Sequence, residues 1–280
     1  MGIVQEMFKP DIHPGSVLTG PLVKRFPMNE HGRDFVVGDL HGAFKLLESA
    51  LEQVGFDADV DRLFCVGDLI DRGPDSAQVR NLLNKPYFHS VLGNHDYDFA
   101  CMTSREAHVH AIVNYHGMGW AKVLPEHDIH AIQDALRACP LVIEVETLAG
   151  VTGIVHAQVP TGVTWQDFVA DINSGRRRTL ATALESRSHP DQFEDVPGIH
   201  RVFVGHDPKF LGAERRGNVW SIDTGAVYRQ EGVVLSGFNK VVGMLTLVNL
   251  AADVSDLEMA APGDDCDTAV IQCSRDRARG

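Results

Sequence analysis

Residues 34–42, DFVVGDLHG, combine the pattern of a buried strand with a polar loop. Residues 34–37 form a short, mainly apolar run that ends in Gly38-Asp39, a pattern typical of a buried parallel strand. Apolar residues then recur three and four positions apart over residues 44–54, before Gly55. This spacing predicts an amphipathic helix with a glycine stop. Asp39 and His41 therefore lie in the loop between a strand and a helix.

The same unit recurs twice further along the chain. Residues 63–66 end in Gly67-Asp68, and Pro74 opens a second predicted helix, with Pro86 beyond its end. A third run, residues 90–92, ends in the motif GNHD, residues 93–96. Three such units predict a βαβ series with a parallel sheet. In sheets of this kind, functional groups gather on the loops at the carboxyl ends of the strands.

The remainder of the chain divides into a helical segment and a second group of strands. Residues 97–138 have a mostly helical pattern, with breaks near residues 117–119 and at Pro125. Strands are predicted at residues 141–145, 153–156, 201–204, 219–223 and 241–249. We interpret them as a mainly antiparallel sheet that packs face to face with the first sheet. Residues 1–32 are predicted to be a loose lead-in, residues 33–250 a single domain, and residues 251–280 a largely disordered tail.

Composition narrows the class of protein. The chain has 280 residues, of which 44% are hydrophobic and 22% charged, as in a soluble globular protein. A formal net charge of −13 argues against a broad basic face for nucleic acid. The five cysteines form no CxxC pair, so neither a disulfide framework nor a thiolate zinc site is indicated. With no signal pattern and no apolar run of membrane length, we expect a cytoplasmic protein without a membrane partner.

Polar side chains with metal-binding capacity follow the ends of the predicted strands. They are Asp39, His41, Asp68, Asn94, His156 and His206. Carboxylate, amide-oxygen and imidazole donors together suit a pair of divalent transition ions, and not calcium or a closed structural zinc site. A shared carboxylate can bridge two ions in hydrolytic sites of this kind. Each residue alone is more often structural, but their shared position after glycine-rich strand ends predicts a two-metal site.

The motifs GDLHG, GDLIDRG and GNHD, followed downstream by HA and GH, resemble the metallophosphoesterase (calcineurin-like) superfamily. Within it they are most similar to the phosphoprotein phosphatase branch, in the style of the bacterial and phage serine/threonine protein phosphatases. The resemblance covers about residues 33–250, which would be the catalytic domain. We expect an α/β fold, a four-layer α/β/β/α sandwich of two mixed sheets flanked by helices.

The resemblance also implies roles for the candidate metal ligands. Asp39 and His41 would hold the first ion, and Asp68 would bridge it to the second. Asn94, His156 and His206 would complete the second site. The cofactor would be two divalent metal ions, with Mn²⁺ the first expectation and iron, zinc or nickel also compatible with these donors.

The same resemblance implies a mechanism of direct water attack. A hydroxide that bridges the two ions would attack phosphorus in line, with no phosphoenzyme. His95 would protonate the leaving alkoxide, and Asp71 would hold and charge-stabilise His95. Arg72 and Arg187 would bind the phosphate oxygens through forked hydrogen bonds. The expected activity is that of a phosphoprotein phosphatase, with a phosphorylated protein or small phosphoester as substrate.

Two alternatives remain at this point. Asp96 stands where protein phosphatases of this branch usually carry glutamate, and Asp207 where threonine is usual. The GNHD form resembles the symmetrical diadenosine tetraphosphatases, but those enzymes typically carry alanine at the position of Asp71. A non-catalytic pseudoenzyme would lack the acid or a ligand, and all of them are present here. The oligomeric state is left open by the sequence.

Several other residues are interpreted as structural. His108 and His110 are two positions apart on a predicted helix and so face different directions. His116 is interpreted as a surface or packing residue, and Trp120 as a core or rim residue. The run Arg176–Arg178 is interpreted as a solvated loop.

Overall fold

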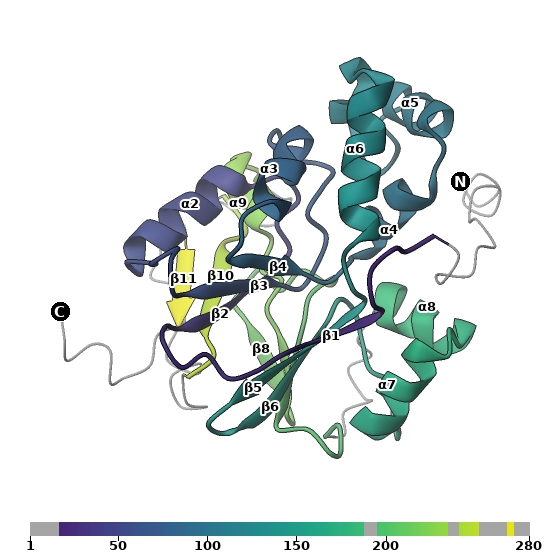
Figure 1. Cartoon of the computed structure of the whole chain (residues 1–280). Coiled ribbons are helices and arrows are strands. Elements are labelled where there is room, and N and C mark those ends of the chain that lie inside the picture. Colours follow the sequence, from purple (N-terminus) through teal and green to yellow (C-terminus); the bar gives the residue numbers. More distant parts are fainter. Residues whose placement is uncertain (1–16, 188–194, 235–240, 252–267, 272–280) are drawn as a thin grey trace.

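The computed structural model describes residues 17–187, 195–234, 241–251 and 268–271. Two β-sheets lie face to face, and helices cover their outer faces (Figure 1). This arrangement is the four-layer sandwich of two mixed sheets that the sequence predicts.

The first sheet contains the three predicted strand–loop–helix units. Its order is β11 (Thr268–Ile271), β10 (Leu245–Asn249), β2 (Asp34–Val37), β3 (Arg62–Cys65) and β4 (Phe88–Ser90). Strands β2, β3 and β4 are parallel, whereas β10 pairs antiparallel with β2. The βαβ prediction is therefore confirmed, although β4 lies two residues earlier than the predicted third strand. The assignment of the strand at residues 241–249 to the second sheet was wrong, because β10 pairs with β2 in the first.

Within the described part of the chain, three helices lie on the outer face of this sheet: two connect its parallel strands, and the third precedes β10. They are α2 (Phe44–Gln53), α3 (Val79–Leu83), which follows the short 3₁₀ turn η2 (Ser76–Gln78), and α9 (Ala226–Gln230) (Figure 1). Helix α2 ends just before Gly55, as predicted, and it buries Phe44, Leu47 and Ala50. The second predicted helix begins at residue 76, two residues after Pro74.

The second sheet corrects one prediction. Its order is β1 (Val23–Phe26), β5 (Val142–Thr147), β6 (Gly150–Val155), β7 (Arg201–Val204), β9 (Val219–Ser221) and β8 (Glu214–Arg216). Pairs β1–β5, β6–β7 and β7–β9 are parallel, and only β5–β6 and β8–β9 are antiparallel among these described strands. The prediction of a mainly antiparallel sheet was therefore wrong.

The cause is a crossover that the sequence reading missed. Two helices, α7 (Trp165–Asn173) and α8 (Arg177–Glu185), lie between β6 and β7. Parallel strands need a crossover connection of a dozen or more residues, and this helical pair supplies one. The run Arg176–Arg178 consequently lies at the start of α8 and not in a loop.

Two strands lie in segments expected to be irregular. Strand β1 falls within the lead-in and pairs in parallel with β5 at the edge of the second sheet. Strand β11 falls within the expected tail and pairs in parallel with β10. The other residues of the tail from position 252 onward, and residues 1–16, lie outside the described residues.

The core between the sheets follows from alternation along the strands. Phe35 and Val37 of β2 face the helices, while Val36 joins an apolar cluster with residues of β3, β5, β6, β7, β9 and β10. This period of two is the geometry of a strand buried on both faces. It accounts for the near-continuous apolar run in the sequence.

A helical segment stands beside the first sheet (Figure 1). It contains α4 (Asn94–Cys101), α5 (Ser104–Ile112), the 3₁₀ segment η3 (Tyr115–Val123) and α6 (Glu126–Arg137). The predicted break is present, because His116 and Gly117 have left-handed backbone angles inside η3. Among the helices of the described ranges, none is both long and apolar enough to cross a membrane.

Candidate active site

The carboxyl ends of strands from both sheets meet at one edge. The backbone N–H of His206, after β7, donates to Asp39 Oδ2, after β2, over 3.0 Å. His156 Nδ1, after β6, lies 2.9 Å from the carbonyl oxygen of Val66, after β3. The two sheets therefore share a single set of strand-end loops. These loops bring together all six predicted ligand residues.

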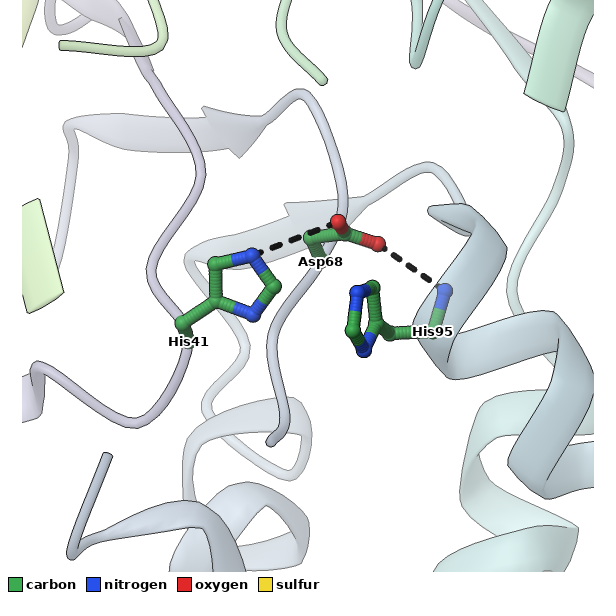
Figure 2. A group of neighbouring side chains, drawn as sticks. All are labelled: His41, Asp68 and His95. Carbon is green, nitrogen blue, oxygen red and sulfur yellow. Dashed lines mark hydrogen bonds and ion pairs between the residues drawn. The ribbon is translucent and has the colours of Figure 1, made fainter. Parts of the chain in front are cut away.

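Asp68 lies at the centre of a first cluster, with His41 and His95 (Figure 2). His41 Nε2 is 3.4 Å from Asp68 Oδ2. The backbone N–H of His95, at the start of α4, donates to Asp68 Oδ1 over 3.1 Å. The rings of His41 and His95 approach edge to face, with centroids 4.8 Å apart.

Asp68 also belongs to a second cluster, with Asn94, His156 and His206. His156 Nε2 lies 3.5 Å from Asp68 Oδ1 and 3.1 Å from Asn94 Oδ1. His206 Nδ1 lies 2.9 Å from Asn94 Oδ1 and 3.2 Å from His156 Nε2. Asp68 is thus the carboxylate common to both clusters, as a bridging residue must be.

The ring nitrogens that face these clusters carry lone pairs. A carbonyl oxygen can only accept, so the contact with Val66 puts the proton of neutral His156 on Nδ1 and leaves Nε2 as an acceptor. The same holds for His41, whose Nδ1 is 2.7 Å from the carbonyl oxygen of Ile70. His156 Nε2 therefore faces another acceptor, the side-chain oxygen of Asn94. Converging acceptor atoms fit a cation between them.

The protonation states also fit metal ligands, which must be neutral imidazoles and ionised carboxylates. Burial lowers the pKa of both His41 and His156. Burial and the neighbouring His156 lower the pKa of His206 to about 4. Burial by itself would raise the pKa of Asp68, but the surrounding histidines, His156 first among them, hold it well below its usual range.

The surroundings of the Asp39 carboxylate also suit a bound cation. Its Oδ1 is buried and has no hydrogen-bond partner in the described structure. Burial, followed by the nearby carboxylates of Asp223 and Asp68, raises its pKa well above the usual value. An orphaned carboxylate oxygen beside other buried carboxylates is costly unless a cation neutralises it. The residues present therefore fit a pair of divalent ions.

The backbone around the site is held in unusual conformations. Among the described residues other than glycine, those with positive φ are His41, Asp68, Asp71, Arg72, Asn114, His116 and His206. Five of these seven are predicted site residues. Such conformations cost about 1–3 kcal/mol each and cluster where structure serves function. Gly93 is required by close approach, because a Cβ there would collide with the carboxylate of Asp68.

The predicted acid and its partner are in contact. His95 Nδ1 lies 2.7 Å from Asp71 Oδ2, and both side chains are buried. Burial would lower the pKa of His95, but the negative charges of Asp68 and Asp71 outweigh it and raise that pKa. A raised pKa favours the protonated imidazole, the form that a general acid requires.

The predicted phosphate-binding arginines border a cavity of about 400 Å³. The cavity is lined by Asp68, Arg72, Asn94, His95, His116, Gly117, Arg187 and His206. Arg72 Nη1 is 2.7 Å from His41 Nε2, and Nη2 is 3.0 Å from His95 Nε2. Arg72 and Arg187 are exposed, whereas the histidines and carboxylates below them are mostly buried. The cavity thus has cationic side chains at its rim and candidate metal ligands in its floor.

Two residues around the site were not predicted from the sequence as part of it. His116, interpreted as surface or packing, lines the cavity, and its ring centroid is 5.4 Å from that of His95. Trp120 reaches Asp71 through its indole N–H. The available signal was the glycine-flanked break around residues 117–119, which marks an irregular backbone but not its location in the fold.

Asp96 connects two loops of the site through hydrogen bonds to their backbone. Its carboxylate accepts backbone hydrogen bonds from Leu69 at 2.9 Å and from Gly93 at 3.0 Å. Burial, together with the negative charge of Asp68, raises the pKa of Asp96 to about 8. Asp96 therefore joins the loop of Asp68 to the loop of Asn94. Asp207, the second departure from the family pattern, pairs with Lys209 at 2.7 Å.

Comparisons with known proteins agree with this geometry. Residues 35–210 match the model of the family described as calcineurin-like phosphoesterase. Serine/threonine-protein phosphatase 2 of Salmonella typhimurium is 32% identical over 197 residues, which cover 69% of this chain and 87% of that protein. A symmetrical bis(5'-nucleosyl)-tetraphosphatase of Coxiella burnetii is 32% identical over 148 residues, 49% of this chain and 44% of that protein.

A solved structure supports the fold. The crystal structure of a candidate diadenosine tetraphosphatase superposes with a TM-score of 0.53, covering 82% of this chain and 94% of the other. The identity is 23%, so this likeness concerns the fold alone. The family match and the Salmonella relative go further, because they span most of the chain that carries the site. The chain belongs to the calcineurin-like phosphoesterase family, in the branch that includes the bacterial serine/threonine phosphatases.

Proposed function

We propose that this phosphoesterase is a serine/threonine protein phosphatase that uses two divalent metal ions, with Mn²⁺ as the first candidate. The observation that carries the proposal is the buried contact between His95 and Asp71, 2.7 Å long, beside the shared carboxylate of Asp68. An alkoxide is a poor leaving group, so its departure benefits from a positioned acid. A His–Asp pair of this kind supplies such an acid.

In this proposal, six residues bind the metal ions and two arginines bind the phosphate. Asp39, His41, Asp68, Asn94, His156 and His206 hold the ions. When bound, the ions polarise the phosphoryl oxygens and lower the pKa of the attacking water. Arg72 and Arg187 bind the remaining phosphate oxygens at the rim of the cavity.

His95 completes the reaction at the leaving oxygen. Its Nδ1 is engaged by Asp71, and its Nε2 lies 3.0 Å from Arg72 Nη2. When Arg72 turns to the phosphate, Nε2 is the atom that carries and donates the proton. Water adds to phosphorus, the bond from phosphorus to the seryl or threonyl oxygen breaks, and that oxygen receives the proton from Nε2. Asp71 keeps the imidazole oriented and stabilises its positive charge before the transfer.

A symmetrical dinucleotide tetraphosphatase is the second candidate function. It is favoured by the Coxiella relative and by the aspartate at position 96. Asp71 favours the protein phosphatase, because the dinucleotide enzymes that this chain resembles typically carry alanine there. A departing nucleotide phosphate is already a good leaving group and has less need of an acid.

The products formed decide between the two functions: a phosphopeptide yields inorganic phosphate, whereas symmetrical cleavage of diadenosine tetraphosphate yields two ADP and is followed through the nucleotide. Manganese-loaded protein is assayed with a phosphoserine/phosphothreonine peptide and, side by side, with diadenosine tetraphosphate. We expect a higher kcat/KM on the peptide, and loss of activity with a chelator. A preference for the dinucleotide overturns the proposed substrate class, and inactivity on every phosphoester overturns the enzyme itself.

Arg72→Lys provides a test of phosphate binding. The guanidinium offers two parallel N–H donors, and an ammonium cannot reproduce that fork. We expect a KM for the phosphopeptide increased by about tenfold, and weaker inhibition by inorganic phosphate, from the loss of one charge-assisted hydrogen bond. Arg80→Lys, on the exposed side of α3, is the matched control. Unchanged KM and phosphate inhibition in Arg72→Lys contradict the assigned role.

A further inference from the structure

Trp120 is connected to the catalytic histidine through Asp71. Its indole Nε1–H donates a 2.7 Å hydrogen bond to Asp71 Oδ1. The other oxygen, Oδ2, is 2.7 Å from His95 Nδ1. Asp71 has no solvent exposure, so water cannot replace either donor. Each oxygen of the carboxylate is therefore engaged by a different N–H group.

The segment that carries Trp120 is held against the loop of Asp71. The backbone N–H of Arg72 donates to the carbonyl oxygen of Gly117 over 2.9 Å. A Cβ at Gly117 would lie 2.6 Å from Arg72 N, and its φ of +90° also requires glycine. The indole ring packs on Phe99 of α4, with centroids 5.1 Å apart. These contacts fix the distance from the indole N–H to the carboxylate.

The two hydrogen bonds restrict the rotation of the Asp71 carboxylate. With both oxygens engaged, the carboxylate plane is fixed, and Oδ2 remains aligned with the imidazole. Without the indole donor, Oδ1 would be a buried acceptor with a lost partner, which is costly for an ionised group. The carboxylate could then turn toward other donors and release His95 from its orientation.

We propose that Trp120 is a positioning residue of this active site, which acts through Asp71 to hold His95 in the orientation for proton donation. This inference rests on the role of His95 in the proposed function. A purely structural role, through the ring contact with Phe99, would not depend on the indole N–H. Trp120→Phe separates the two, because it keeps an aromatic ring and removes only the donor.

The test compares two aryl phosphates that differ in their demand for an acid. Phenyl phosphate releases a weakly acidic phenol, whereas 2,4-dinitrophenyl phosphate releases a strongly acidic one that needs no proton to depart. For Trp120→Phe we expect kcat on phenyl phosphate to fall by about tenfold, a fraction of the full effect of a general acid. On dinitrophenyl phosphate the fall is at most about twofold, and KM for both changes little.

Trp165→Phe is the matched control. Trp165 also donates an indole hydrogen bond to a carboxylate, that of Glu144 at 2.7 Å, but it lies on α7, away from the cavity. We expect Trp165→Phe to lower the melting temperature without changing the ratio of the two rates. Equal slowing on both substrates by Trp120→Phe, or no slowing on phenyl phosphate, overturns the proposal.

A double variant gives an independent test. If Trp120 acts only through His95, Trp120→Phe causes no further loss in a His95→Asn background. Additive losses overturn the proposal. These tests can fail independently of the proposed function. If the protein prefers diadenosine tetraphosphate to the phosphopeptide, the protein phosphatase proposal is wrong, but the role of Trp120 is still tested by the two aryl phosphates.

Discussion

Replacement of Asp68 by alanine is expected to remove both metal ions and reduce phosphate release to the background rate. Asp68 is the carboxylate common to both clusters, within 3.5 Å of His41 and His156. Its loss also leaves the converging acceptor atoms without the negative charge that offsets two divalent cations. The metal content per chain after dialysis, measured by inductively coupled plasma mass spectrometry, checks the prediction.

Asp34→Ala is the matched control for this variant. Asp34 is also a buried aspartate of the first sheet, but it begins β2 at the opposite end from the site and pairs with Arg62 at 2.7 Å. We expect this control to be less stable and still to bind two ions per chain. An Asp68→Ala protein that is folded and retains two ions contradicts the shared role of Asp68.

Replacement of His95 by asparagine is expected to lower turnover on the phosphopeptide by about 10²–10⁴-fold, the usual size for loss of a general acid. Asparagine can still hydrogen-bond to Asp71 but has no proton to transfer. The metal content should stay at two ions per chain, because the six candidate ligands are unchanged. Steady-state kinetics and metal analysis of the same preparation measure both quantities.

His89→Asn is the matched control, because it replaces a histidine that is remote from the proposed proton transfer. His89 is a half-buried residue of β4 that packs against the rings of Phe26 and Phe64, away from the cavity. We expect its turnover to match that of the unmodified chain. Near-normal turnover of His95→Asn on the phosphopeptide contradicts the assignment of His95 as the general acid.

The candidate site could be predicted largely from sequence because its parts are local. Each candidate ligand lies within four residues of the end of a short strand, as Asp39 does after β2 and Asp68 after β3. The carboxyl ends of parallel strands meet at one edge, so local patterns were enough to infer that distant residues meet. The three parallel strands of the first sheet were predictable for the same reason, whereas β10 had been assigned to the second sheet and β11 to the tail.

What could not be predicted depends on contacts between distant segments. Trp120 and Asp71 are 49 positions apart, and the path between them runs through a segment with three left-handed residues, Asn114, His116 and Gly117. No periodic pattern specifies such a path. Strand β1 has only two apolar residues in VKRF and is stabilised by pairing with β5, which its own sequence does not reveal.

The direction of the second sheet was missed for a related reason. Strand patterns show where strands occur but not how they pair. Pairing depends on the connections, and the amphipathic helix α7, which buries Trp165, Phe168 and Ile172, was not recognised between β6 and β7. Once that crossover is included, the parallel pairing of β6 with β7 follows from the general geometry of such connections.

We propose that hydrolysis requires two metal ions held by these strand-end loops. The most direct test of this proposal measures phosphate release from the phosphopeptide as a function of manganese ions bound per chain, starting from chelated protein. We expect no activity without metal and a plateau at two ions per chain. A plateau at one ion per chain, or full activity in the metal-free protein, contradicts the proposal.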